Sequence, residues 1–107
     1  MGSAVLDADG QIYLGVNLYH FTGGPCAELV ALAAARAAGA QGLSTIVAVG
    51  DEGRGVRSPC GRDRQILADY YPDIRVIVQA DDQLVTVKIS DLLPAAFDWA
   101  PDSGEGL

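Results

Sequence analysis

The chain has 107 residues, half of them hydrophobic, and this length suits one small domain with a single core. Its 14 acidic residues outnumber its 7 basic residues and give a net charge of −7, so the chain as a whole repels the phosphates of nucleic acids. The apolar runs are too short to cross a bilayer and no signal peptide opens the chain, so we expect a cytoplasmic protein without a membrane partner.

The predicted elements alternate between strands and helices along the chain. Residues 3–17 predict a hairpin with its turn at residues 7–10, and residues 26–38 are dominated by helix formers. There follow a strand at 44–49, a glycine-rich loop at 51–59, a helix at 60–70, strands at 75–79 and 84–89, and a short helical segment from 90. This order predicts an α/β fold with a mixed five-stranded sheet and helices packed on its faces.

Each of the two cysteines, Cys26 and Cys60, directly follows a proline at the start of a predicted helix. We expect Pro25 at the first helical position, where its missing N–H costs nothing. Two cysteines are too few for a disulfide scaffold, and a helix N-terminus lowers the pKa of a thiol toward the thiolate that binds metal. If the two helices lie side by side, Cys26, Cys60 and Asp63 could converge on one ion, with Glu28 in the same pocket.

Two longer phrases carry a resemblance to a known family. Residues 17–30 read N-L-Y-H-F-T-G-G-P-C-A-E-L-V, and residues 58–65 read S-P-C-G-R-D-R-Q. Zinc nucleobase deaminases combine a His or Cys two residues before a Glu with a P-C-x-x-C motif. From about Ser3 to Trp99 the chain resembles the cytidine deaminase family, most closely its blasticidin S deaminase branch. The expected domain is residues 3–99, followed by a polar tail at 100–107.

The resemblance implies a zinc centre and its chemistry. Cys26 and Cys60 would be thiolate ligands, and Asp63 stands where the family has a third cysteine. Water activated by the metal would attack the amino-bearing carbon, and Glu28 would move its proton to the ring nitrogen and then to the leaving amine. Arg64 matches an arginine that hydrogen-bonds the thiolates in relatives with three cysteines.

The resemblance also implies contacts with the substrate. Asn17 matches an asparagine that holds a sugar hydroxyl, and backbone groups around Ser58 would meet the amino group of the substrate. Tyr19 stands where cytidine deaminases usually carry a glutamate that grips the ribose, which favours a substrate other than plain cytidine. Aromatic candidates for the pocket or for reaching a neighbouring subunit are Phe21, Phe97 and Trp99.

These observations lead to one main hypothesis, a zinc-dependent hydrolytic deaminase of a free cytosine-type nucleoside or nucleoside antibiotic. The family's three-layer fold has an N-terminal helix that is missing before the first strand here. Either the chain is trimmed there, or a neighbouring subunit covers that face of the sheet, and we expect a homo-oligomer, a tetramer or a dimer. The only histidine, His20, is expected to be a pocket wall or a satisfied loop residue.

The alternative is a protein that has the deaminase-like fold but binds no metal. Asp63 would then cap the second helix or pair with Arg62 or Arg64, and the protein would be an inactive nucleoside-binding or oligomeric protein. Deamination of bases within nucleic acid fits the acidic chain poorly.

Overall fold

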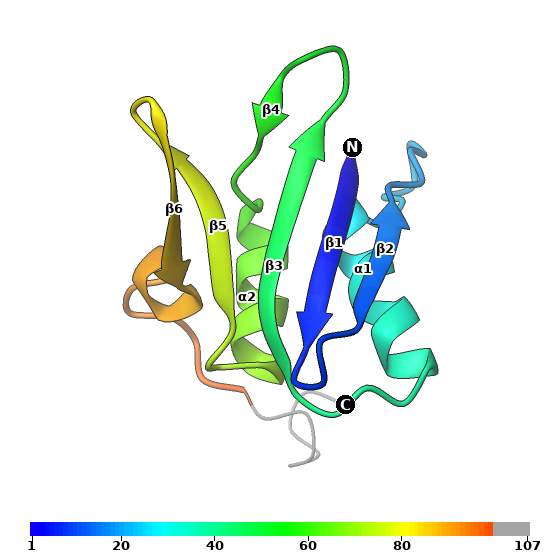
Figure 1. Ribbon diagram of the computed structural model, residues 1–107, viewed down its shortest axis with the longest axis vertical. Coiled ribbons are helices and arrows are strands. Elements are labelled where there is room, and N and C mark those ends of the chain that lie inside the picture. The colour runs from blue at the N-terminus through cyan, green and yellow to red at the C-terminus, as the bar shows by residue number, and fades with distance from the viewer. Residues whose placement is uncertain (100–107) are drawn as a thin grey trace.

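A computed structural model describes residues 1–99 as one sheet with two helices packed on the same face (Figure 1). The strands are β1 (Gly2–Asp7), β2 (Ile12–Val16), β3 (Leu43–Gly50), β4 (Gly55–Val56), β5 (Arg75–Ala80) and β6 (Gln83–Lys88). The helices are α1 (Ala27–Ala37), α2 (Gly61–Tyr70) and the short 3-10 helix η1 (Ile89–Leu92). The expected tail at 100–107 lies outside the described residues, and no helix within residues 1–99 is long and apolar enough to cross a membrane.

The sheet is mixed, as the alternation of elements predicted. Its strand order is β2-β1-β3-β5-β6, with β3 and β5 parallel and the other neighbours antiparallel. A sixth strand, β4, lies inside the predicted loop at 51–59, where Val56 pairs with Val49 at the end of β3. Glycines with positive φ at Gly53 and Gly55 allow this sharp return of the chain, which the sequence patterns did not reveal.

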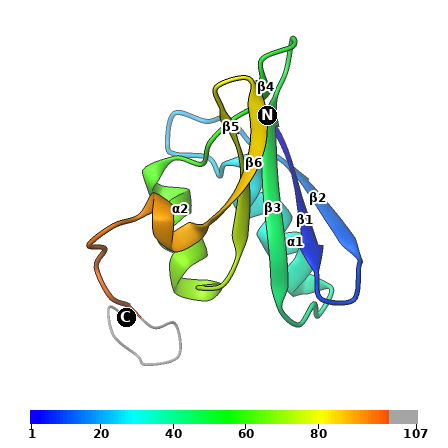
Figure 2. The same ribbon diagram turned by 60° about the vertical axis from the view of Figure 1, so that its left-hand side comes forward.

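The hydrophobic core lies between the sheet and the two helices. Val5, Ile46 and Val76 point to the helices from three neighbouring strands and are at most 2% exposed. Figure 1 shows α1 behind β1 and β2, and α2 behind β3 and β5; in the turned view of Figure 2, α2 lies at the left, next to β5. On the opposite face Leu14 and Val16 are 71% and 68% exposed. The described residues therefore supply the sheet and one helical layer of the three-layer fold that the resemblance implies.

Helix α1 packs very closely on β2 because small residues meet there. Ala27 and Ala31 are fully buried, and a Cβ added at Gly15 would lie 2.3 Å from the backbone nitrogen of Ala31. No side chain larger than hydrogen fits at Gly15. This contact sets the distance between α1 and the sheet, and with it the position of the residues that open the helix.

Both helices begin one residue later than expected. Cys26 and Cys60 are the N-caps of α1 and α2, each with an extended backbone at φ −70° and −71°. The placement of Pro25 inside the helix is wrong, because the extended cap conformation of Cys26 puts the proline outside it. Neither cap is closed by a side-chain hydrogen bond, so both thiols remain available for other contacts.

Candidate functional site

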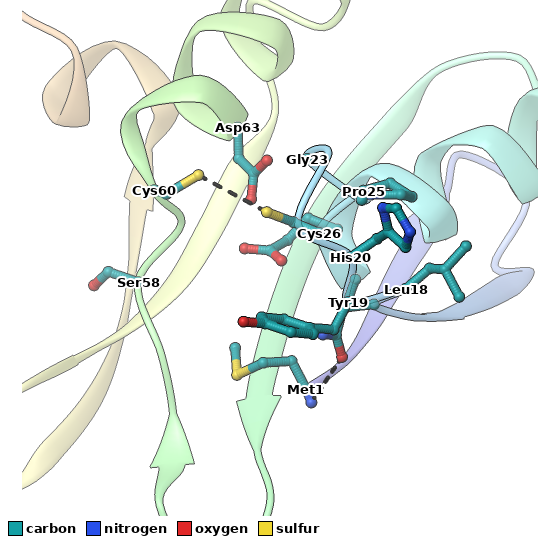
Figure 3. A pocket seen from close by; sticks show the side chains of 14 residues that line it. Met1, Leu18, Tyr19, His20, Gly23, Pro25, Cys26, Ser58, Cys60 and Asp63 are labelled. Atoms are coloured by element: carbon teal, nitrogen blue, oxygen red, sulfur yellow. Dashed lines mark hydrogen bonds between the residues drawn. The ribbon is translucent and has the colours of Figure 1, made fainter.

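The two helix caps bring three possible metal ligands together, as Figure 3 shows. The Sγ atoms of Cys26 and Cys60 lie 4.0 Å apart. With one carboxylate oxygen of Asp63, from the first turn of α2, the three ligand atoms all lie within 4.8 Å of one another. This is the convergence predicted from the two Pro-Cys helix starts. It arises because α1 and α2 run on the same face of the sheet and start at the same end.

Asp63 is buried without a hydrogen-bonding partner among the described residues. The residue is 1% exposed, and both of its carboxylate oxygens lack a donor. It therefore makes neither of the two contacts that the metal-free alternative predicted, a cap of α2 or a pair with Arg62 or Arg64. An unpaired buried carboxylate is costly, and a bound cation would offset that cost.

Two groups near Asp63, the Glu28 carboxyl and the Cys26 thiol, have raised pKa values. Glu28 is 5% exposed, and this burial, with the nearby Asp63 carboxylate adding to it, raises the pKa of Glu28 to about 7. Burial and the charges of Asp63 and Cys60 raise the pKa of the Cys26 thiol to about 12. The expectation that the start of α1 lowers this pKa is wrong for the protein without a cation, because burial and neighbouring acids outweigh the helix end. A cation among these groups reverses the effect.

A cavity of about 350 Å³ opens beside the cluster and suits a small heterocyclic compound. Its wall contains three of the substrate-contact candidates, Asn17, Tyr19 and Ser58. The three candidate metal ligands and Glu28 also line it. The walls carry no lysine or arginine side chain among the described residues. The wall thus combines the acidic groups of Glu28 and Asp63 with the amino group of Met1.

Sequence reasoning overlooked part of the pocket wall. Met1 lines the cavity, and its amino nitrogen donates a hydrogen bond of 3.1 Å to Oδ1 of Asn17. No local signal marked Met1, because only the pairing of Gly2 with Val16 across β1 and β2 brings it there. His20 also lines the pocket, and its Nδ1 accepts a hydrogen bond from the backbone nitrogen of Thr22, so it is both a wall and a satisfied loop histidine.

Three aromatic candidates lie away from the cavity wall. Phe21 is 91% exposed and stacks on His20, with ring centroids 4.5 Å apart. Trp99 lies edge-on to Tyr70 at 6.1 Å, and Gln65 donates a hydrogen bond to the carbonyl of Phe97. The segment at 97–99 therefore folds back on α2 of its own chain. Its contact with a neighbouring subunit stays a prediction.

Arg64 connects two backbone segments beside the cluster by hydrogen bonds. Its guanidinium donates hydrogen bonds to the backbone carbonyl of Pro59 at 2.8 Å and to that of Leu92 at 3.1 Å. These bonds join the turn that carries Cys60 to the short helix η1. In this arrangement Arg64 supports the position of the thiol through the backbone, whereas the resemblance implied a direct bond to thiolates.

Known proteins share both the fold and much of the sequence. No family model matches the chain. A cytidine deaminase of Halalkalibacterium halodurans is 39% identical over 103 residues, covering 91% of this chain and 76% of the relative. A blasticidin-S deaminase of Bacillus cereus is 34% identical over 106 residues, with the same coverage of both chains.

Solved structures agree with this. The crystal structure of a cytidine deaminase from Burkholderia pseudomallei aligns with a TM-score of 0.76 at 32% identity, covering 90% of this chain and 80% of that one. The cytidine deaminase from Mycobacterium tuberculosis aligns with a TM-score of 0.77 at 29% identity, covering 92% and 78%. Fold and site thus define an α/β domain of the deaminase type with a candidate metal centre at two helix starts. The chain belongs to the cytidine deaminase family.

Proposed function

We propose that the protein is a zinc-dependent hydrolytic deaminase of a free cytosine-type nucleoside or nucleoside antibiotic. The observation that carries this proposal is the buried Asp63 carboxylate, which has no donor of its own and lies within 4.8 Å of two cysteine sulfurs. The relatives named cytidine deaminase and blasticidin-S deaminase support the reaction class.

The cluster fits zinc in its donor chemistry. Zinc takes thiolate sulfur and carboxylate oxygen in tetrahedral sites, and catalytic sites have three protein ligands and one open position. Cys26, Cys60 and Asp63 supply those three ligands and carry the same formal charge as three thiolates. When bound, zinc supplies a Lewis acid that makes a water molecule nucleophilic at neutral pH.

The residues of the chain would then orient the substrate and move its protons. Glu28 lies buried beside the cluster and lines the cavity, where its carboxyl can accept a proton from one reacting group and donate it to another. It takes one proton from the attacking water and passes it to the ring nitrogen, then takes the second proton from the hydroxyl added to carbon and gives it to the amine, which leaves as ammonia. The amino-bearing carbon thereby exchanges its nitrogen for the water oxygen.

The pocket favours a substrate without phosphate groups. Its wall includes the acids Glu28 and Asp63 and, among the described residues, no lysine or arginine side chain that could pair with a phosphate, and the Met1 amino group on the wall already donates to Asn17. Asn17 and Tyr19 offer polar contacts to a sugar or an equivalent group at the open end. The exposed Tyr19, in place of the expected glutamate, supports the blasticidin-S-type branch of substrates.

Metal content and product formation together test the proposal. Protein purified without chelator is expected to contain about one zinc per chain by elemental analysis, and to release ammonia from cytidine or blasticidin S. The exposed turn variant Asp82→Asn serves as a matched loss of one carboxylate and should behave as the parent protein. Zinc far below one per chain in both proteins would contradict the proposal.

A further inference from the structure

We propose that Cys26 and Cys60 are a site of reversible oxidation, at which the metal-free protein forms one disulfide that closes the candidate metal centre. The inference rests on the proposed function only in that the same two thiols serve as ligands. The disulfide is a second state of the site, which forms when an oxidant is present and the metal is absent.

Geometry favours the bond between the two thiols. Their sulfurs are 4.0 Å apart, and a disulfide needs about 2.05 Å, so the sulfurs must approach by about 2 Å. Both residues are helix caps with an extended backbone, and neither side chain makes a capping hydrogen bond. Rotation about their Cα–Cβ bonds therefore breaks no capping hydrogen bond. Figure 3 shows the two sulfurs facing each other across the gap between the two helix starts.

Composition limits the product to one disulfide. Cys26 and Cys60 are the only cysteines of the chain, and the third corner of the cluster is the carboxylate of Asp63. A carboxylate does not undergo thiol oxidation, so no third thiol is present to exchange with the disulfide or to link two chains. With Asp63 at the third corner, Cys26 and Cys60 can form only one disulfide within a chain, and a thiol reagent can reduce it.

The chemistry balances with a peroxide as the oxidant. The thiolate sulfur of Cys60, the more exposed of the two, attacks hydrogen peroxide, the O–O bond breaks, and a sulfenic acid and water form after proton transfer. The sulfur of Cys26 then attacks that of Cys60, the S–O bond breaks, and a second water leaves. Two thiols are oxidised and one peroxide is reduced to two waters. A dithiol reagent reverses the change by exchange.

The same geometry makes metal binding and oxidation exclusive. The disulfide removes two of the three ligand atoms, and Asp63 alone does not hold zinc. Conversely, zinc coordinated by both thiolates would slow their reaction with peroxide. Bound zinc should therefore lower the rate of thiol oxidation, and disulfide formation should lower the affinity for zinc.

Thiol counting and mass spectrometry on the full chain test the inference. After chelator treatment and reduction, removal of reductant and a small excess of hydrogen peroxide, both thiols should become unreactive to a thiol reagent. The intact mass should fall by two hydrogens, and dithiothreitol should restore both thiols. Zinc added before peroxide should slow the loss of thiols at least about tenfold, in line with the protection of coordinated thiolates.

Three variants separate the proposed bond from other oxidations. Cys60→Ser and Cys26→Ser should each gain oxygen mass or form linked dimers, and Asp63→Cys should retain one free thiol or cross-link between chains. Oxygen addition without loss of hydrogens in the parent protein would overturn the inference, as would persistent free thiols. Because the assay needs neither turnover nor bound zinc, a failed deaminase assay leaves its outcome readable.

Discussion

The start of α1 and the start of α2 share one local design and carry different chemistry. Each helix is preceded by a proline and then by a cysteine cap with an extended backbone. Each has one buried acid in its first turn. In α1 that acid is Glu28, two residues after its cap. In α2 it is Asp63, three residues after its cap.

That difference of one residue separates the two roles. Residues three apart are neighbours on a helix surface, and the third helical residue reaches back to its cap. Asp63 therefore lies with its own cap Cys60 among the candidate ligands, whereas Glu28 lines the cavity beside them. Two similar helix starts thus supply three candidate ligands and one candidate proton carrier, which differ in the spacing of the acid from its cap.

The two starts also differ in how they are held. The start of α1 is fixed by close contact with β2 at Gly15, whereas a Cβ at Gly61 in α2 would meet nothing within 4 Å. The turn before α2 is instead tied by Arg64 to η1. One helix start is placed by packing and the other by hydrogen bonds.

The largest expected effect is on turnover at the α1 acid. Glu28→Gln should lower kcat by about 10²- to 10⁴-fold, because general acid–base catalysis contributes on this scale, while zinc content stays unchanged. Steady-state kinetics and elemental analysis on the same samples measure both. Retention of the parental kcat would remove Glu28 from the proton transfer and break the assignment of roles.

The α2 acid should instead control the metal. Asp63→Asn replaces a charged ligand by a neutral amide and should lower zinc affinity by at least about tenfold, whereas Asp63→Cys should keep or raise it. Competition with a chromogenic chelator measures these affinities. Equal zinc affinity in Asp63→Asn and the parent would place Asp63 outside the ligand set.

Glu28 should also make the metal-free protein less stable as pH rises. Its pKa is raised from 4.5 to about 7 in the fold, so the folded state binds more protons than the unfolded state between these pH values. Stability should therefore be full below pH about 4.5 and fall through pH about 7, by on the order of 3 kcal/mol. Urea titrations of chelator-treated protein measure this, and Glu28→Gln should flatten the slope. An unchanged slope in the variant would assign the effect to other groups.

The smallest effects compare the two ways of holding a helix start. Gly15→Ala should destabilise by about 1–3 kcal/mol, because its Cβ overlaps the backbone of α1, and it should weaken zinc binding by displacing Cys26. Gly61→Ala meets open space at an ordinary helical position and should be neutral or stabilise by about 0.4–1 kcal/mol. Thermal denaturation of both variants measures the difference. Similar destabilisation in both would show that close packing at Gly15 is not what places α1.

Much of this protein could be read from its sequence. The strands and helices are local consequences of apolar alternation, helix formers and glycine or proline breaks, and the two Pro-Cys phrases marked the helix starts and their acids. The cluster of Cys26, Cys60 and Asp63 was predictable because helices on one sheet face begin near each other.

Tertiary structure alone decided the rest. The burial of Asp63 without a donor and the raised pKa values of Glu28 and Cys26 depend on what surrounds each group, which spacing along the chain does not contain. The short strand β4, the approach of α1 to Gly15 and the entry of Met1 into the pocket are all products of long-range pairing. Sequence determined which groups are present at the site, and packing determined their distance, their charge and what can bind between them.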